Sequence, residues 1–179
     1  MNRIVSQGAA QMNHSISVIG LGSVGGAVCR NLLKQNYKLV NVFDAYKDNV
    51  SFGEGVNVCS NVEDAVRGSD IVITALPKPE NIKELVVNQR MFECMNRSSI
   101  WIDHSTTDYF QTLDFAKEAK EQYDISTLEC PLTGGVTLLK QGQMTMFVGG
   151  ERDKFDECKP YLECSSNNLM YLGEIGTAS

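Results

Sequence analysis

The chain has 179 residues, 42% of them hydrophobic, which is enough for one domain with a full core and too few for two large ones. Its 22 acidic and 16 basic residues give a net charge of -6, and no stretch gathers Lys and Arg into a patch that could follow phosphates, which excludes nucleic acid as an expected partner. No apolar run approaches the ~20 residues needed to span a bilayer, so we expect one soluble domain and no membrane association.

The first predicted elements form a strand, a tight turn and a helix. The apolar run SISVIG at residues 15–20 ends in glycines, and the apolar positions of VGGAVCRNLLKQN at residues 24–36 recur at helical spacing. Further strands are predicted at residues 39–44, 71–77 and 99–105, with helices between them. Strands that read as continuous apolar runs and alternate with helices predict a parallel sheet covered on both faces.

Several helices have recognisable first residues. Asn61 precedes VEDAVRG, Pro79 opens PENIKELVVNQ, and Thr107 precedes DYFQTLDFAKEAKEQ, whose early Asp108 suits the helix dipole. After ISTLECP at residues 125–131, a strand is predicted at 143–150, a helix at 151–164 and a last strand at 169–172. Pro160 is expected to kink or break the helix that contains it.

A glycine-rich turn connects the first strand to the first helix. Its residues fit the pattern GxGxxG: Gly20, Leu21, Gly22, Ser23, Val24 and Gly25. The first glycine allows the tight turn, the second lets a pyrophosphate approach the backbone, and the third lets the helix pack closely on the sheet. Because the pattern follows a strand and opens a helix, it predicts a dinucleotide-binding domain with a doubly wound, mostly parallel Rossmann-type α/β fold.

Asp44 is expected to select the nucleotide. It ends the second strand, 24 residues after Gly20, where a carboxylate accepts hydrogen bonds from the ribose hydroxyls of NAD and repels the 2′-phosphate of NADP. Lys47 follows closely and could instead turn toward a 2′-phosphate. NAD is therefore the predicted cofactor, with NADP as the alternative.

Four stretches in order resemble the β-hydroxyacid dehydrogenase family, which includes 3-hydroxyisobutyrate dehydrogenase and tartronate semialdehyde reductase. They are VIGLGSVGGAV, ITALPKPENIKELV, IWIDHSTTDYF and LECPLTGGVTLLKQGQMTMFVGG, and the resemblance covers essentially residues 15–179. The resemblance implies an enzyme that exchanges a hydride between the nicotinamide and a small 3-hydroxy acid.

The resemblance also implies roles for particular residues. Thr133, Gly134 and Gly135 match the segment that holds the substrate carboxylate, through a hydroxyl and two backbone N–H groups. Leu76, Pro77 and Thr106 match positions that line the ribose and nicotinamide. His104 stands where the family usually has an apolar residue, so we expect a structural or pocket-shaping role for it rather than a catalytic one. Thr133 itself replaces the usual Ser.

In the family, a strand like LMYLG leads into a long helix that carries the catalytic Lys. By this resemblance the Lys would follow Ser179 by about three residues, which leaves no catalytic residue within the chain. We therefore expect a tail at residues 1–13, an NAD(P)-binding domain at 14–174 and the start of an interdomain helix at 175–179, with the C-terminal helical domain absent. This chain alone is expected to bind nucleotide with little or no turnover, and the full-length protein to be a homo-oligomer.

The tail and the cysteines bear on the compartment. Residues 1–13 contain one Arg, no acid and no apolar core of a secretory signal, so we expect a flexible tail, with a short mitochondrial presequence as the alternative. The six cysteines form no CxxC pair and only two histidines accompany them, so no metal site is predicted and the thiols are expected to be reduced. The cytoplasm is the predicted compartment, with the mitochondrial matrix as the alternative.

Two other functions remain open at this point. One is a complete non-catalytic module that keeps the fold for cofactor sensing or partner binding; the absence of the Lys favours it, and the Thr133-Gly134-Gly135 segment argues against it. The other is a reductase of imines or other carbonyls from the same superfamily, in which the general acid differs.

Overall fold

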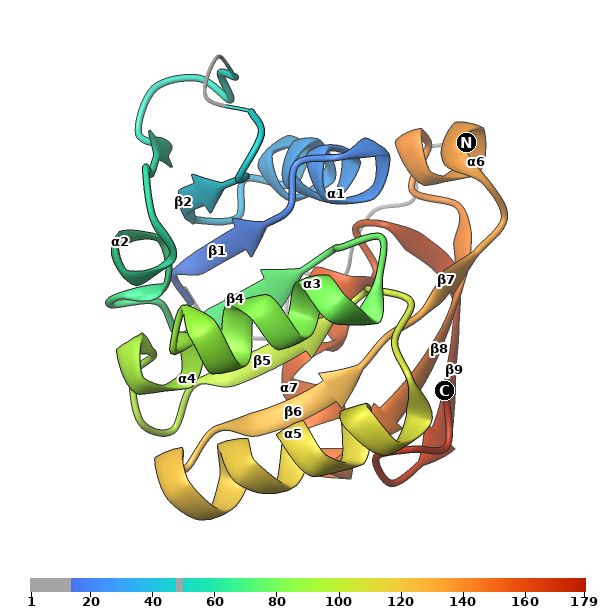
Figure 1. The fold of residues 1–179 in the computed structure, drawn as a ribbon. Helices are drawn as coiled ribbons and strands as arrows, with labels where there is room; N and C mark the ends of the chain where they lie inside the picture. Colours follow the sequence, from blue (N-terminus) through green and yellow to red (C-terminus); the bar gives the residue numbers. More distant parts are fainter. Residues whose placement is uncertain (1–13, 48–49) are drawn as a thin grey trace.

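A computed structural model describes residues 14–47 and 50–179, so the tail predicted for residues 1–13 lies outside the described residues. Helices and strands alternate along most of the chain (Figure 1). The strands are β1 Ile16–Ile19, β2 Leu39–Phe43, β3 Asn57–Val58, β4 Ile71–Thr74, β5 Ile100–Asp103, β6 Ser126–Glu129, β7 Leu132–Thr133, β8 Met144–Gly150 and β9 Ser166–Gly173. The helices are α1 Ser23–Lys34, α2 Val62–Val66, α3 Pro79–Lys83, the π-helical turn η1 Glu84–Asn88, α4 Met91–Cys94, α5 Tyr109–Tyr123, α6 Val136–Lys140 and α7 Arg152–Leu162.

The strands of the described residues form one sheet in the order β3-β2-β1-β4-β5-β6-β8-β7, with β9 paired to β8. The first six strands in this order are parallel, and β8 runs antiparallel to β6. The order 3-2-1-4-5-6 is that of the dinucleotide-binding doubly wound fold, and the chain reverses its direction of winding between β1 and β4. The predicted Rossmann-type fold is therefore confirmed, and ligands are expected at the carboxyl ends of β1 and β4.

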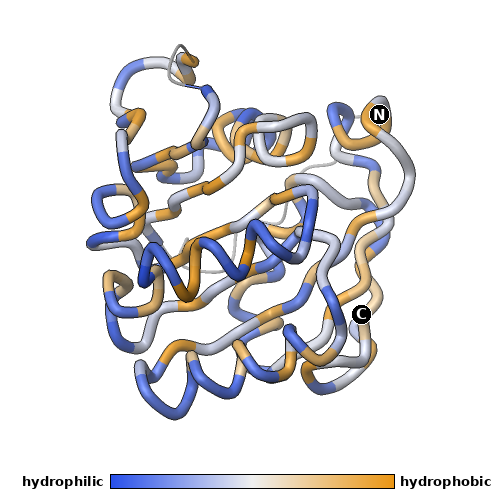
Figure 2. The backbone as a smooth tube through the Cα atoms, in the orientation of Figure 1, coloured by the Kyte–Doolittle hydropathy of each residue, from blue (hydrophilic) through white to orange (hydrophobic). Residues whose placement is uncertain are grey.

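Each central strand contributes apolar side chains to both faces of the sheet. Ile71 and Ile73 of β4 belong to one core cluster with residues of α1, α6 and α7, whereas Val72 belongs to a second cluster with residues of α2, α3, α4 and α5. Trp101 of β5 lies on the same face as Val72. In Figure 1, α3 and α5 lie in front of the sheet and α7 behind it, and Figure 2 shows hydrophilic residues along the outward turns of α5. Burial on both faces explains why these strands read as unbroken apolar runs.

The helix starts agree in part with the sequence analysis. Asn61 caps α2 by accepting a hydrogen bond from the Asp64 N–H, and Pro79 occupies the first turn of α3. The cap of α5 is Asp108, which accepts from the Gln111 N–H, rather than Thr107. The helix predicted to kink or break at Pro160 does not break there but continues to Leu162, because a proline so near the end removes few backbone hydrogen bonds.

Residues 174–179 form a turn rather than the first turn of a helix. Gly176 has a φ of 93°, and the buried Glu129 carboxylate accepts hydrogen bonds from the backbone N–H groups of Gly176 (2.6 Å) and Ala178 (2.8 Å). The Ser179 hydroxyl also donates to this carboxylate. A single buried acid at the end of β6 thus holds the segment after β9 against the sheet, and no motif in the sequence indicated this contact.

Within the part of the chain that the structure describes, no helix combines the length and apolar character that crossing a membrane requires. All six cysteines are free thiols.

Candidate functional site

Two glycines of the turn between β1 and α1 are needed for the fold, because a side chain at either position would collide with the backbone. Gly20 has a φ of 90°, and a Cβ there would lie 2.5 Å from the Ala75 carbonyl oxygen. A Cβ at Gly25 would lie 1.8 Å from the carbonyl oxygen of Gly20. Any larger residue at either position would force the turn away from β4 or the helix away from the sheet.

Gly22 differs, because nothing lies within 4 Å of a Cβ built on it. It is the N-cap of α1, no side chain caps this helix, and its first turn contains no acidic residue. The space beside Gly22 is therefore open, next to a helix terminus whose uncapped N–H groups give it positive character. This combination of donors and free volume fits the pyrophosphate of a dinucleotide.

Asp44 lies directly across the turn. Its Oδ2 accepts a hydrogen bond from the Leu21 N–H at 2.7 Å, and its Oδ1 accepts one from the Tyr46 N–H at 2.9 Å. The Lys47 ammonium donates to the carbonyl oxygen of Leu21 at 2.8 Å. Asp44 is thus oriented by the backbone on both sides, and the remaining lone pairs of its half-buried carboxylate can accept ligand hydroxyls.

A cavity of about 530 Å³ opens at the carboxyl ends of β1, β2, β4 and β5; we call it the cofactor cavity. The predicted residues that line it are Gly20, Gly22, Ser23, Val24, Asp44, Leu76, Pro77 and Thr106. Leu21 and Gly25 do not line it; both are buried, and Gly25 packs against Gly20. Other lining residues went unrecognised in the sequence because no short motif marks them: Phe43, Tyr46, Asn81, Glu84, Leu85 and Gln89.

The loop after β4 is held in place by buried polar groups. The Leu76 N–H donates to Ser105 Oγ at 2.8 Å, and the Ser105 N–H donates to Asp103 Oδ1 at 3.0 Å. The Thr74 hydroxyl also donates to Asp103 Oδ1 at 2.8 Å, and it accepts from the indole N–H of Trp101. Burial raises the pKa of Asp103 above its ordinary value, although hydrogen bonds from Ser105 and Thr74 act in the opposite direction. This network supports the wall of the cofactor cavity formed by Leu76.

His104 follows the last residue of β5 and is only 7% exposed. Its Nδ1 lies 2.8 Å from the Cys130 carbonyl oxygen, and the residue is among those that line the cofactor cavity. Burial lowers the pKa of His104 from 6.5 to about 4, partly offset by the hydrogen bond to Cys130. The imidazole is therefore neutral at physiological pH.

The low pKa of His104 predicts a pH dependence of stability. Between pH 6.5 and about 4, this histidine takes up a proton in the unfolded chain but not in the folded one, so stability falls as the pH decreases. The loss attributable to His104 is on the order of 3 kcal/mol. Urea unfolding at pH 7 and pH 4.5 should show a smaller loss for the His104→Asn variant than for the wild type. Equal losses in the two proteins would contradict the prediction, since Asp103 and the other acids are common to both.

The residues matched to the substrate carboxylate lie apart from the cofactor cavity. Thr133 ends β7, and Gly134 and Gly135 connect it to α6 with φ values of 134° and 85°. All three are exposed, and none lines either described cavity. The positive φ values explain why glycines occupy both positions.

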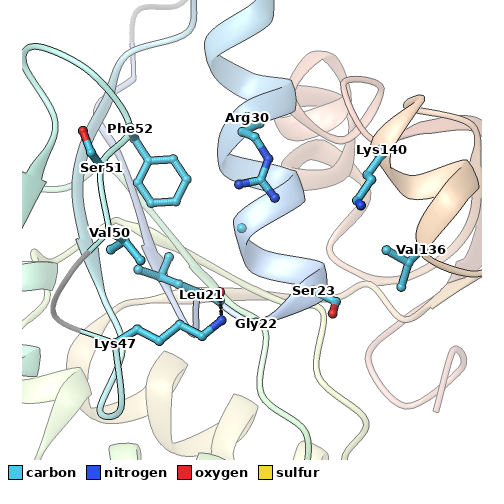
Figure 3. Close-up of a pocket in the computed structure, with 11 residues that line it drawn as sticks. Leu21, Gly22, Ser23, Arg30, Lys47, Val50, Ser51, Phe52, Val136 and Lys140 are labelled. Carbon is cyan, nitrogen blue, oxygen red and sulfur yellow. Dashed lines mark hydrogen bonds between the residues drawn. The ribbon is translucent and has the colours of Figure 1, made fainter.

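A second cavity of about 370 Å³ lies between α1, α6 and the segment around residues 50–52. Figure 3 shows Arg30 on α1 and Lys140 on α6, with Lys47, Val50 and Phe52 across from them. Gly22 and Ser23 line both cavities, so the second one adjoins the start of α1 from the side away from β4.

The chain is similar to the NAD-binding domains of known dehydrogenases. The family described as the NAD-binding domain of 6-phosphogluconate dehydrogenase matches residues 15–173. A probable mitochondrial 3-hydroxyisobutyrate dehydrogenase of Dictyostelium discoideum is 30% identical over 166 residues, which cover 91% of this chain and 51% of that protein. The chain therefore spans about half the length of such relatives.

Solved structures show the same arrangement of helices and strands. Mycobacterium tuberculosis 3-hydroxyisobutyrate dehydrogenase with L-serine superposes with a TM-score of 0.85 at 25% identity, covering 93% of this chain and 57% of that one. A variant of an imine reductase from Myxococcus stipitatus in complex with NAD+ superposes with a TM-score of 0.80 at 20% identity, and the match covers 94% of this chain and 58% of the reductase chain. At that identity the imine reductase shows the shared fold alone.

Proposed function

Because the chain belongs to the β-hydroxyacid dehydrogenase family and spans its N-terminal NAD-binding domain, we propose that residues 14–174 bind a nicotinamide dinucleotide in the cofactor cavity. The pyrophosphate lies at the start of α1, against Gly22, Ser23 and Val24, where the helix offers uncapped N–H groups. The adenosine ribose meets Asp44 at the end of β2. The nicotinamide half extends toward Leu76, Pro77 and Thr106, at the ends of β4 and β5.

The observation that carries the proposal is the position of Asp44 beside the glycine turn, with its carboxylate anchored by the Leu21 N–H and lining the cavity. A fixed negative charge at this point favours the two ribose hydroxyls of NAD and disfavours the additional phosphate of NADP. Lys47 donates to the Leu21 carbonyl oxygen, so its charge is already engaged with the backbone. We therefore propose NAD as the preferred cofactor.

When bound, the nicotinamide supplies the position that accepts or donates a hydride. The substrate is proposed to be a small 3-hydroxy acid, as the names of the Dictyostelium and Mycobacterium relatives indicate for those proteins. The backbone N–H groups of Gly134 and Gly135 and the Thr133 hydroxyl would hold its carboxylate, since the three residues are exposed and offer donors without a competing charge. The extra methyl of Thr133, compared with serine, narrows the space for the substrate.

The proton transfer is proposed to use a Lys that follows Ser179 in the full-length protein. Lys78 directly precedes α3, and Lys140 lines the second cavity rather than the cofactor cavity. Neither lysine is therefore proposed as the proton donor.

We further propose that residues 175–179 lead into the second domain, and that the full-length protein is a homo-oligomer. The compartment stays a prediction: the cytoplasm, with the mitochondrial matrix as the alternative. Imine reduction is less well supported, because the imine reductase shares only the fold.

Titration of the 179-residue chain with NADH and with NADPH tests the cofactor assignment. We expect NADH to bind at least about tenfold more tightly, because the 2′-phosphate would face Asp44. Binding is followed by the fluorescence of the reduced nicotinamide, and AMP should compete with NADH. Tighter binding of NADPH would overturn the preference for NAD, and binding of neither nucleotide would overturn the proposed function.

A further inference from the structure

His104 is fixed in one tautomer by its surroundings. Its backbone N–H donates to the Thr74 carbonyl oxygen at 2.8 Å, and its Nδ1 lies 2.8 Å from the Cys130 carbonyl oxygen. A carbonyl oxygen only accepts hydrogen bonds, so Nδ1 carries the proton. Nε2 of this neutral ring is therefore a hydrogen-bond acceptor whose direction is set by β5 and by the end of β6.

Nε2 has access to the cofactor cavity. No hydrogen bond to it is found among the described residues, and the only buried side-chain polar atom without a partner there is Oγ1 of Thr127. Nε2 is thus not sealed in the core, and His104 lines the same cavity as Leu76 and Thr106. An acceptor held in a preset direction at a cavity wall is suited to a donor on a ligand.

The order of the strands indicates which part of the ligand His104 meets. Asp44 follows β2 on one side of β1, whereas His104 follows β5, which is separated from β1 by β4 on the other side. With the pyrophosphate at the start of α1, the adenosine half extends toward Asp44 and the nicotinamide riboside half toward His104. The donors on that half are the ribose hydroxyls and the N–H of the carboxamide.

We propose that Nε2 of His104 accepts a hydrogen bond from the nicotinamide riboside half of the cofactor and thereby positions that half in the cofactor cavity. The inference rests on the proposed function, because it requires that the cavity bind a nicotinamide dinucleotide. His104 here positions the nicotinamide and does not transfer a proton.

Two variants separate the two nitrogen atoms of the ring. His104→Asn places an amide near the position of Nδ1 and can still donate to the Cys130 carbonyl oxygen, but it lacks an acceptor at the position of Nε2. His104→Gln reaches the position of Nε2 with an acceptor oxygen. Affinities for NADH and for ADP-ribose, which lacks the nicotinamide, are measured by calorimetry for both variants and the wild type, together with their thermal midpoints.

We expect His104→Asn to weaken NADH binding about tenfold and to leave ADP-ribose binding within about twofold, whereas His104→Gln recovers most of the NADH affinity. Parallel loss of both ligands, or no loss of either, would overturn the inference while leaving the cofactor assignment intact. A wild-type chain that binds neither ligand would instead overturn the proposed function.

A measurement on the wild type keeps the inference falsifiable if a variant fails to fold. The 15N resonance of His104 Nε2 should shift on saturation with NADH and remain in place with ADP-ribose; equal shifts with both ligands would contradict the contact. The analogue in which the carboxamide amino group is a methyl group distinguishes the donors. If the wild type binds this analogue more weakly than NADH and His104→Asn binds both equally, the donor to Nε2 is the carboxamide N–H. If His104→Asn weakens the binding of NADH and of the analogue by the same factor, the donor is a ribose hydroxyl.

Discussion

Replacement of Gly25 by alanine is expected to lower the free energy of unfolding by about 3 kcal/mol, because the new Cβ would lie 1.8 Å from the carbonyl oxygen of Gly20. That oxygen belongs to the backbone of the turn and cannot rotate away, so α1 must move off the sheet. For a domain of this size, the corresponding decrease in the thermal midpoint is about 10 °C. Thermal unfolding followed by circular dichroism measures it, and NADH binding should be lost as well.

The matched control is alanine at Gly22, where no atom lies within 4 Å of the added Cβ. We expect the midpoint of this variant to fall by no more than about 4 °C, the cost of alanine at a helix N-cap. NADH binding should nevertheless weaken tenfold or more, because the methyl group occupies space that the pyrophosphate requires. An unchanged midpoint for Gly25→Ala would show that the turn is built differently. Unchanged NADH affinity for Gly22→Ala would place the pyrophosphate elsewhere.

Asparagine at Asp44 is expected to change the ratio of NADH to NADPH affinity by on the order of 100-fold. The affinity for NADH should fall about tenfold, because the ribose hydroxyls lose hydrogen bonds to a charged acceptor. The affinity for NADPH should rise by a similar factor, because the repulsion of its 2′-phosphate is removed. The amide oxygen can still accept from the Leu21 N–H, so the glycine turn keeps one of its supports. Competition titrations with both nucleotides measure the ratio.

The control for Asp44→Asn is Glu54→Gln, which removes one negative charge from an exposed loop residue that lines neither described cavity. It should change neither affinity by more than about twofold, because exposed charges at a distance are screened by salt. If Asp44→Asn weakened NADH and NADPH by the same factor, Asp44 would act only by supporting the turn, and the preference for NAD would need another origin.

Much of the proposed cofactor site could be predicted from the sequence, because its chemistry depends on the backbone. A glycine turn between a strand and a helix, and an acid at the end of the next strand, are contiguous patterns whose geometry follows from local rules. The strand order that brings Gly20 next to Ala75 and Leu76 follows from the doubly wound topology. Ser23, Val24, Leu76, Pro77 and Thr106 accordingly line the cofactor cavity.

Other features depend on contacts between residues far apart in the chain. Ser105 accepts from the Leu76 N–H, and His104 is directed by Cys130, because β4, β5 and β6 are neighbours in the sheet. The buried Glu129 carboxylate accepts hydrogen bonds from the N–H groups of Gly176 and Ala178, which lie in the turn that follows β9. Glu129 lies more than 40 residues before Gly176 in the chain, and a contact over that separation leaves no periodic signal in either segment.

The sequence by itself determined the fold class, the glycine turn and the acid beside it, since apolar runs, helix caps and glycine spacing are local consequences of side-chain chemistry. Only the tertiary structure decided which nitrogen of His104 contacts the Cys130 carbonyl oxygen, which backbone groups orient Asp44, and that Thr133 does not line the cofactor cavity. These depend on the direction of side chains across neighbouring strands, and that direction exists only once the sheet has formed.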